Sequence, residues 1–186
     1  MANSLDIAVL VGSLRKDSLT RKTALAMAKL APSGVKLSIV EIGDLAHYNQ
    51  DLDTATPPAS WAAFRARIKA ANGVLFFTPE YNRSVPGVLK NAIDVGSRPY
   101  GQSVWSGKPA GVVSTSPGAL GAFGANQHLR QSLVFLDMPA MQQPEAYLGN
   151  VGKWFDEGGE LTDKPAGEFL TKFITAYAKW AGRFAG

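Results

Sequence analysis

The sequence contains no cysteine, and this absence excludes several classes of protein at once. Disulfide scaffolds, cysteine-ligated zinc or iron–sulfur centres and thiol nucleophiles all require that residue. Histidine is nearly as scarce, because only His47 and His128 occur and they lie far apart in the chain. This spacing provides no pair of metal ligands, so we predict no metal site.

Long apolar runs and clusters of charge are also missing. The segment from Met1 to Asp6 is short and polar and lacks the features of a secretory leader. No apolar run approaches the roughly 20 residues that cross a bilayer. The net charge is +4, yet there is no block of like charges and no nucleic-acid-binding signature. We therefore expect a cytoplasmic protein that binds neither membrane nor nucleic acid.

What the sequence does contain is ample material for a core, since 46% of its 186 residues are hydrophobic. Length and composition favour a single domain over residues 1–186. Short apolar runs alternate with segments of helical spacing. The expected strands are Leu5–Val11, Val35–Ile42, Val74–Phe77, Ala110–Val113 and a weaker, proline-containing region from Pro139 to Leu148.

Residues at helical spacing lie between these runs. Leu19 to Leu30 forms the first predicted helix, and Ser60 is the expected cap of the second. Pro86 is expected in the first turn of the third, and Thr162 or Asp163 should cap the closing helix. The alternation predicts an α/β fold with a parallel sheet covered by helices on both faces. A five-stranded, flavodoxin-like order, 2-1-3-4-5, fits best.

Ligands of such folds bind outside the carboxyl ends of the strands, so we expect the binding residues in the loops that follow the strands. The first is Gly12-Ser13-Leu14-Arg15-Lys16-Asp17-Ser18-Leu19-Thr20. It combines three hydroxyl groups and the forked cation of Arg15 with the free amides of a helix N-terminus, which suits a phosphate. An ordinary polar loop with a serine cap is the alternative interpretation.

Two familiar phosphate loops do not match. The first loop lacks the Gly-Lys-Ser/Thr of nucleotide triphosphatases and the G-x-G-x-x-G of dinucleotide-binding folds. The glycine-rich loop with Gly118, Gly121 and Gly124 follows a late strand and has a different spacing. Neither class of nucleotide-binding protein is therefore supported.

The loops after the third and fourth strands carry the remaining unusual chemistry. Thr78 to Gly87 is stiffened by two prolines, and it offers the flat face of Tyr81 and the amide of Asn82. Ser114 to Gly124 is built from small residues that let backbone amides approach the edge of a planar ligand. Taken alone, the loop Thr78–Gly87 is equally well interpreted as a stiff turn with an exposed tyrosine, and the loop Ser114–Gly124 as a flexible glycine-rich connection. Together with the first loop they indicate a site for a flat heterocycle bearing one phosphate.

Two segments resemble the NADPH-dependent FMN reductase family, with its bacterial chromate and quinone reductases as the most similar branch. They are Gly12-Ser13-Leu14-Arg15…Ser18 and the more specific Pro79-Glu80-Tyr81-Asn82…Pro86-Gly87-Val88-Leu89-Lys90-Asn91…Asp94. The resemblance covers nearly the whole chain. It implies a homodimer or homotetramer that uses FMN with NADPH or NADH.

The resemblance also implies roles for individual residues. The FMN phosphate would be held by Ser13, Arg15, Ser18, Leu19 and Thr20, although the family often has asparagine at the last position. Pro79, Glu80, Tyr81 and Asn82 would line the ring and ribityl chain, and Ser116 and Gly118 would lie beside its other edge.

The implied activity is hydride transfer from NAD(P)H through FMN to quinones, with metal oxyanions such as chromate as further acceptors. No side chain acts as a catalytic acid or base, because the cofactor carries the chemistry. Arg83 and Arg98 are the candidates for binding the NADPH phosphate or an anionic acceptor. The alternatives are a reductase of diffusible FMN, a flavodoxin-like electron carrier, which the basic net charge disfavours, and a scaffold flavoprotein.

Overall fold

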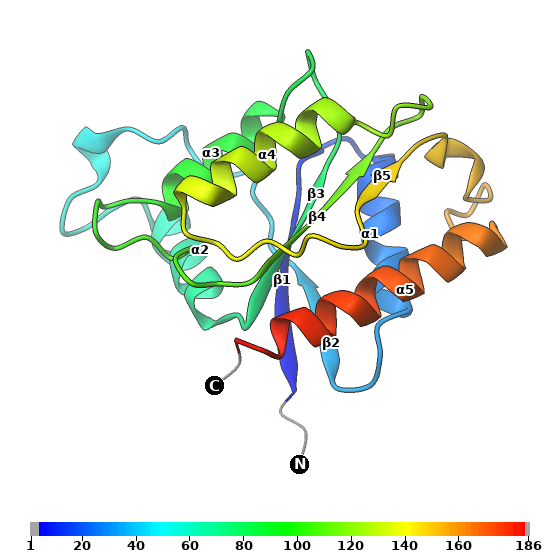
Figure 1. The fold of residues 1–186 in the computed structure, drawn as a ribbon. Helices are drawn as coiled ribbons and strands as arrows, with labels where there is room; N and C mark the ends of the chain where they lie inside the picture. Colours follow the sequence, from blue (N-terminus) through cyan, green and yellow to red (C-terminus); the bar gives the residue numbers. More distant parts are fainter. Residues whose placement is uncertain (1–3, 185–186) are drawn as a thin grey trace.

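Five parallel strands form the centre of the computed structural model, which describes residues 4–184 (Figure 1). The strands pair in the order β2-β1-β3-β4-β5, which confirms the predicted order 2-1-3-4-5. Their bounds are β1 Leu5–Val11, β2 Val35–Ile39, β3 Gly73–Thr78, β4 Ala110–Thr115 and β5 Ala146–Leu148.

Five α-helices cover the two faces of this sheet. They are α1 Leu19–Lys29, α2 Ala59–Ala70, α3 Gly87–Gly96, α4 Phe123–Phe135 and α5 Lys164–Ala181, with short 3₁₀ turns η1 Gln50–Leu52 and η2 Val151–Lys153. Helices α2, α3 and α4 lie on one face, and α1 and α5 lie on the other (Figure 1). This arrangement is the doubly wound fold that the sequence predicts.

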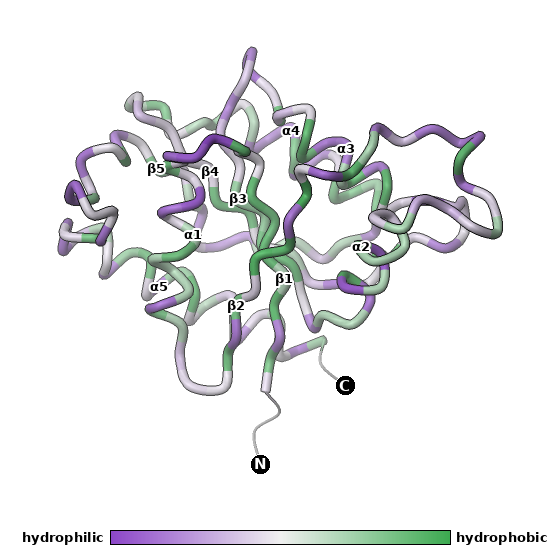
Figure 2. The backbone as a smooth tube through the Cα atoms, turned by 180° about the vertical axis from the view of Figure 1, so that it is seen from behind, coloured by the Kyte–Doolittle hydropathy of each residue, from purple (hydrophilic) through white to green (hydrophobic). Residues whose placement is uncertain are grey.

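Alternate residues of the central strands pack into two separate hydrophobic cores, one on each face of the sheet. Leu10 and Phe76 pack with α2, α3 and α4, whereas Val9 and Phe77 pack with α1 and α5. All six residues of β3 are buried. Because a strand buried on both faces reads as a continuous apolar run, β3 was the strongest strand signal in the sequence. Figure 2 shows the hydrophobic colour concentrated along these inner strands.

The observed first residues of the helices agree only in part with those predicted from the sequence. The side chain of Asp163 accepts a hydrogen bond from the N–H of Ala166 at 2.8 Å, which confirms it as the cap of α5. The prediction for Ser60 is wrong, because the chain enters α2 directly from Pro58 and Ser60 lies inside the first turn. Pro86 likewise stands just before α3 rather than within it.

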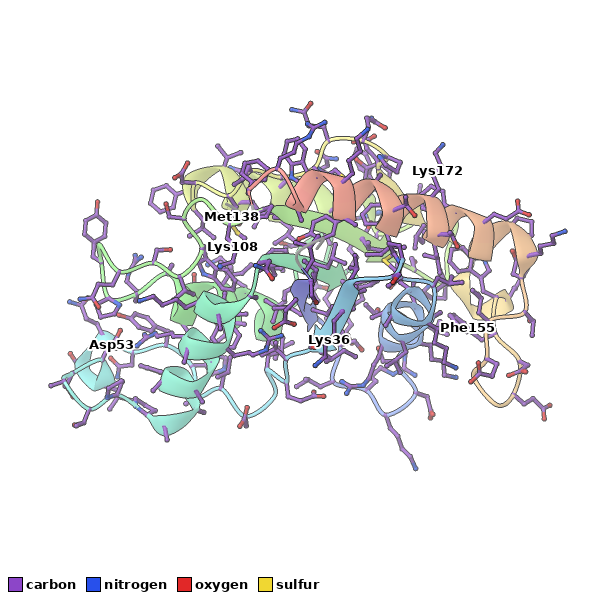
Figure 3. The ribbon with its side chains drawn as sticks, turned by 90° about the horizontal axis from the view of Figure 1, so that it is seen from below. Lys36, Asp53, Lys108, Met138, Phe155 and Lys172 are labelled. Carbon is purple, nitrogen blue, oxygen red and sulfur yellow. The ribbon has the colours of Figure 1, made fainter. Side chains whose placement is uncertain are left out.

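The two outer strands are shorter than the apolar patterns suggest. Strand β2 covers the first five residues of the Val35–Ile42 segment, and β5 comprises only the last three residues of the Pro139–Leu148 region. Proline lacks the N–H that a strand ladder needs, so the part of that region next to Pro139 pairs with β4 only through an isolated bridge between Ala140 and Ala110. Lys36 lies on β2, the strand at the other side of the sheet (Figure 3).

Within residues 4–184, no helix combines the length and apolarity needed to cross a membrane. In the same part of the chain, no three histidine or carboxylate side chains come together as a metal-binding group. Residues 1–3, part of the segment predicted not to be a leader, lie outside the described residues, as do 185–186.

Candidate functional site

Three loops meet at the carboxyl edge of the sheet: the first loop (residues 12–18), the second loop (79–86) and the third loop (116–122). They follow β1, β3 and β4, which are neighbours in the sheet. The N–H of Gly12 donates to the carbonyl of Phe77 at 2.8 Å. A Cβ on Gly12 would lie 3.2 Å from the Pro79 ring, so the absence of a side chain lets the first two loops touch.

The first loop leads into the N-terminus of α1. Ser13 and Ser18 are buried, whereas Arg15 is exposed. The hydroxyl oxygen of Ser18 accepts a hydrogen bond from the N–H of Arg21 at 3.1 Å and so caps the helix. The first N–H groups of a helix have no partner within it, and here they belong to Leu19 and its neighbours. These amides, the two serines and the arginine fit a phosphate.

Thr20 is oriented differently from the other residues of this group. It is buried, and its hydroxyl forms a 2.7 Å hydrogen bond with the hydroxyl of Thr115 at the end of β4. The atom of Thr20 that is left to face an anion at the helix N-terminus is therefore its backbone N–H. The hydroxyl pair also joins the start of α1 to the start of the third loop.

The second loop contains a tight hairpin from Tyr81 to Ser84. The N–H of Ser84 donates to the carbonyl of Tyr81 at 2.9 Å, and the reverse bond is 3.1 Å long. Both central residues, Asn82 and Arg83, have positive φ values, 51° and 62°. This is the pattern of a type I′ turn, which usually contains glycine. This turn was hard to predict from the sequence, because of its two central residues only asparagine favours a positive φ.

The side chain of Glu80 turns from the second loop toward α4. Its carboxylate oxygen Oε2 accepts a hydrogen bond from the N–H of Ala125 at 3.0 Å, and Oε1 lies 3.6 Å from the Arg83 guanidinium. Only 16% of the Glu80 side chain is exposed, whereas Tyr81 is 55% exposed. The side chain of Glu80 is thus engaged with α4 and with Arg83.

The third loop is held against the segment that follows β5. The hydroxyl of Ser116 accepts from the N–H of Gly118 at 3.0 Å, and the Ser116 N–H donates to the Leu148 carbonyl at 2.9 Å. A Cβ on Gly149 would lie 2.6 Å from the carbonyl oxygen of Ala119. The loop is thus a packed segment, although its composition also fitted a flexible connection. The sequence pattern did not indicate Gly149 as part of this site, because the residue that it contacts, Ala119, lies thirty positions earlier in the chain.

The two candidate substrate arginines are placed apart. Arg83 stands at the hairpin tip, with 77% of its side chain exposed. Arg98 follows the far end of α3, about 15 Å along that helix from its start. It lines a cavity of about 400 Å³ together with His47, Tyr48 and Lys90. Burial and the nearby carboxylate of Asp53 raise the pKa of Tyr48 there. Within one chain, Arg98 is not brought to the three loops.

The first and second loops flank the point where the chain reverses its order across the sheet, between β1 and β3. Open α/β sheets bind their ligands at such a switch point. The fold defines a flavodoxin-like protein, and the three loops at the switch point are its candidate ligand site.

Comparison with known proteins narrows this class to a family. A sequence model described as NADPH-dependent FMN reductase matches residues 5–153. A quinone reductase of Pseudomonas putida is 60% identical over 180 residues, 97% of this chain and 96% of that protein. A 2-hydroxy-1,4-benzoquinone reductase of Burkholderia sp is 46% identical, with 95% and 96% covered.

A solved structure extends the same result. FerB, a flavoenzyme NAD(P)H:(acceptor) oxidoreductase from Paracoccus denitrificans, superposes with a TM-score of 0.91 at 43% identity, over 97% of this chain and 98% of that one. The chain belongs to the NADPH-dependent FMN reductase family. The predictions of an oxidoreductase, of FMN as cofactor and of NAD(P)H as co-substrate are thereby confirmed.

Proposed function

We propose that this chain transfers reducing equivalents from NAD(P)H through bound FMN to quinones. The observation that carries the proposal is the meeting of three loops around the free N-terminus of α1. It occurs in a chain that is 60% identical to a protein named quinone reductase. Bound FMN supplies the hydride chemistry. The chain binds the cofactor, orients it and leaves the exposed side of the loops open to the second substrate.

The proposed contacts follow from the geometry of the loops. The phosphate lies at the N-terminus of α1, where buried hydroxyls, one exposed guanidinium and two backbone amides converge. These groups come from Ser13, Arg15, Ser18, Leu19 and Thr20. The ring and ribityl chain lie along the second and third loops, at Pro79, Glu80, Tyr81, Asn82, Ser116 and Gly118. Residues 1–186 act as one domain.

The first experiment is an absorbance spectrum of purified, desalted protein, followed by anaerobic addition of NADPH and then of a quinone. Flavin bands near about 370 and 450 nm should bleach with NADPH and return with the quinone. Colourless protein that reduces only added FMN would make FMN a diffusible substrate. Yellow protein that is inert to both NADPH and NADH would indicate an electron carrier, and either outcome would refute the proposal.

The phosphate site is tested by Arg15→Ala, with Lys16→Ala as a matched control from the same exposed loop. Losing a charge-assisted hydrogen bond to phosphate should weaken FMN binding about 10- to 100-fold. Fluorescence quenching on titration of the FMN-free protein measures the Kd. Equal Kd values for the two variants would remove Arg15 from the site.

We assign anionic co-substrates, NADPH phosphate and metal oxyanions such as chromate, to Arg83 and Arg98. Both guanidinium groups lie on loops, and Arg98 lines an open cavity in which the other cation, Lys90, is paired with Asp94. Each arginine is changed to alanine, and KM is measured for NADPH, NADH and chromate. Arg98→Ala should raise at least one KM for an anion, and unchanged values for NADPH and chromate would exclude it.

We also propose that the chain acts in the cytoplasm as a homodimer or homotetramer. Val134 and Phe135 on α4 are each 80% exposed. Phe135 also lines a cavity of about 520 Å³ between α3 and α4. Burying such an apolar pair against a second copy would be favourable. Light scattering should show a dimer or tetramer that Phe135→Glu weakens, and a monomeric wild-type protein would refute the assembly.

A further inference from the structure

Helix α4 begins without a capping side chain of its own. Its N-cap residue is Ala122, which has a left-handed backbone (φ 58°) and no side-chain hydrogen bond to the helix. The exposed amides of a helix N-terminus favour a negatively charged acceptor. In α4 that acceptor comes from 45 residues earlier in the chain, because Glu80 Oε2 accepts the N–H of Ala125 at 3.0 Å.

Two more contacts join the same face of α4 to the Tyr81–Ser84 hairpin. A Cβ on Gly124 would lie 2.9 Å from the Arg83 carbonyl oxygen, so this glycine permits close approach of the hairpin backbone. One turn further along, His128 Nδ1 forms a 3.0 Å hydrogen bond with the hydroxyl of Ser84. The hairpin, the projection above α3 and α4 in Figure 1, therefore rests on the first two turns of α4.

The hairpin needs such support because its own structure is costly. Arg83 holds a left-handed backbone without being glycine, and a conformation of that kind persists only when its surroundings impose it. Hydrogen bonds between Tyr81 and Ser84 close the turn but do not fix its position on the protein. The contacts with α4 do fix it: Arg83 contributes its backbone carbonyl, Ser84 its hydroxyl, and Glu80 a charged carboxylate.

We propose that Glu80 is a positioning residue: by capping α4 with its carboxylate it holds the second loop in the conformation that receives the flavin. The same carboxylate ties the second loop to the end of the third, since α4 starts where the third loop finishes. A preformed loop spares the ordering cost that a mobile loop adds to binding. This inference rests on the proposed FMN site and assigns the side chain of Glu80, already placed along that site, a role through the helix rather than on the cofactor.

The test compares Glu80→Ala, Glu80→Gln and a matched control, Asp163→Ala, in the full-length protein freed of FMN. Asp163 also caps a helix by accepting an N–H, at 2.8 Å, but it serves α5. Glu80→Ala should weaken FMN binding about tenfold, the loss expected for one charge-assisted hydrogen bond. Glu80→Gln keeps an acceptor for Ala125 and should remain within about threefold of the wild type.

Hydrogen exchange supplies a readout that needs no enzymatic turnover. In Glu80→Ala, amides of residues 80–85 and of Ala125 should exchange faster before FMN is added. In Asp163→Ala, thermal stability should fall while FMN affinity and the exchange of residues 80–85 stay unchanged. Wild-type FMN affinity and loop exchange in Glu80→Ala would overturn the inference. So would an equal loss of affinity in Asp163→Ala, which would reveal a general effect of stability.

If Glu80→Ala fails to fold, Gly124→Ala provides a second test of the contact between the hairpin and α4. The new methyl group would lie 2.9 Å from the Arg83 carbonyl oxygen and 3.0 Å from Glu80 Oε2, so it would push both the hairpin and the capping carboxylate away from α4. FMN affinity should therefore fall without a loss of helix propensity. Unchanged affinity would contradict the need for close contact between hairpin and helix. All these measurements use FMN alone. Wild-type protein that binds FMN but reduces no quinone would refute the proposed function and leave this inference standing.

Discussion

Replacing Asp53 by alanine is expected to destabilise the protein by about 3 kcal/mol, because it leaves a guanidinium buried without its partner. Asp53 follows η1 and lies beside α2 (Figure 3). The two carboxylate oxygens accept hydrogen bonds from Arg65, both at 2.8 Å. Only 3% of the Asp53 side chain and 12% of the Arg65 side chain are exposed.

The expected size follows from what would remain around Arg65. Breaking a buried ion pair on one side costs about 3–5 kcal/mol. The lower value applies here because Arg65 Nε keeps its hydrogen bond to the Val95 carbonyl at 2.9 Å. A chain of 186 residues gains about 0.4 kcal/mol/K of entropy on unfolding, at about 2.1 cal/mol/K per residue. The melting temperature should therefore fall by about 8 °C.

Scanning calorimetry on Asp53→Ala, Glu160→Ala and the double variant Asp53→Ala/Arg65→Met measures this. Glu160 pairs with Lys29 at 2.6 Å, but about two thirds of each side chain is exposed, at 66% and 64%. Its removal should cost at most about 1 kcal/mol, or 2–3 °C. The double variant should regain part of the loss, since no charge is left unpaired. Equal shifts for Asp53→Ala and Glu160→Ala would refute the reasoning.

Three further predictions concern the core and the site edge. Burial first, and then Glu145, raises the pKa of Tyr147 to about 12. The folded state therefore keeps the phenol proton at a pH where the unfolded state has lost it, so the free energy of unfolding should fall from about pH 10 to 12. Urea titrations at alkaline pH should show a less steep fall for Tyr147→Phe. Gly73→Ala would place a methyl 2.5 Å from the Tyr177 hydroxyl and should lower stability by about 1–3 kcal/mol; a higher urea midpoint would contradict this. Thr20→Val removes the 2.7 Å hydroxyl pair and should cost about 1 kcal/mol while FMN affinity changes less than in Ser18→Ala, as calorimetric titration would show.

The fold was readable from the sequence because each strand of a doubly wound sheet is a short apolar run between helical segments. Asp163 was readable as a cap because its contact is local, three residues ahead. The prediction of Ser60 as the cap of α2 was wrong because serine favours cap positions in general, whereas α2 already begins at Ala59, directly after Pro58. Local chemistry thus predicts elements better than it predicts their first residue.

The site was predictable in its loops but not in its side-chain directions. Spacing alone placed the three loops on one edge of the sheet. The contact of Glu80 with α4 spans 45 residues, and nothing in the local pattern signals it. Thr20 reads as one hydroxyl among three, yet its register on α1 turns it toward β4. Arg98 is separated from the loops by the length of α3, which only the folded chain reveals.

The short outer strands also limit how copies of this chain can meet. Strand β5 has three residues and follows Pro144, so it offers an incoming strand almost no ladder to extend. On the opposite side, β2 carries the exposed charge of Lys36, a residue type that discourages pairing between sheets. A second molecule therefore gains little by adding its sheet to this one. Even at high concentration, aggregation by sheet extension should be suppressed, and contacts should form through helices and loops instead.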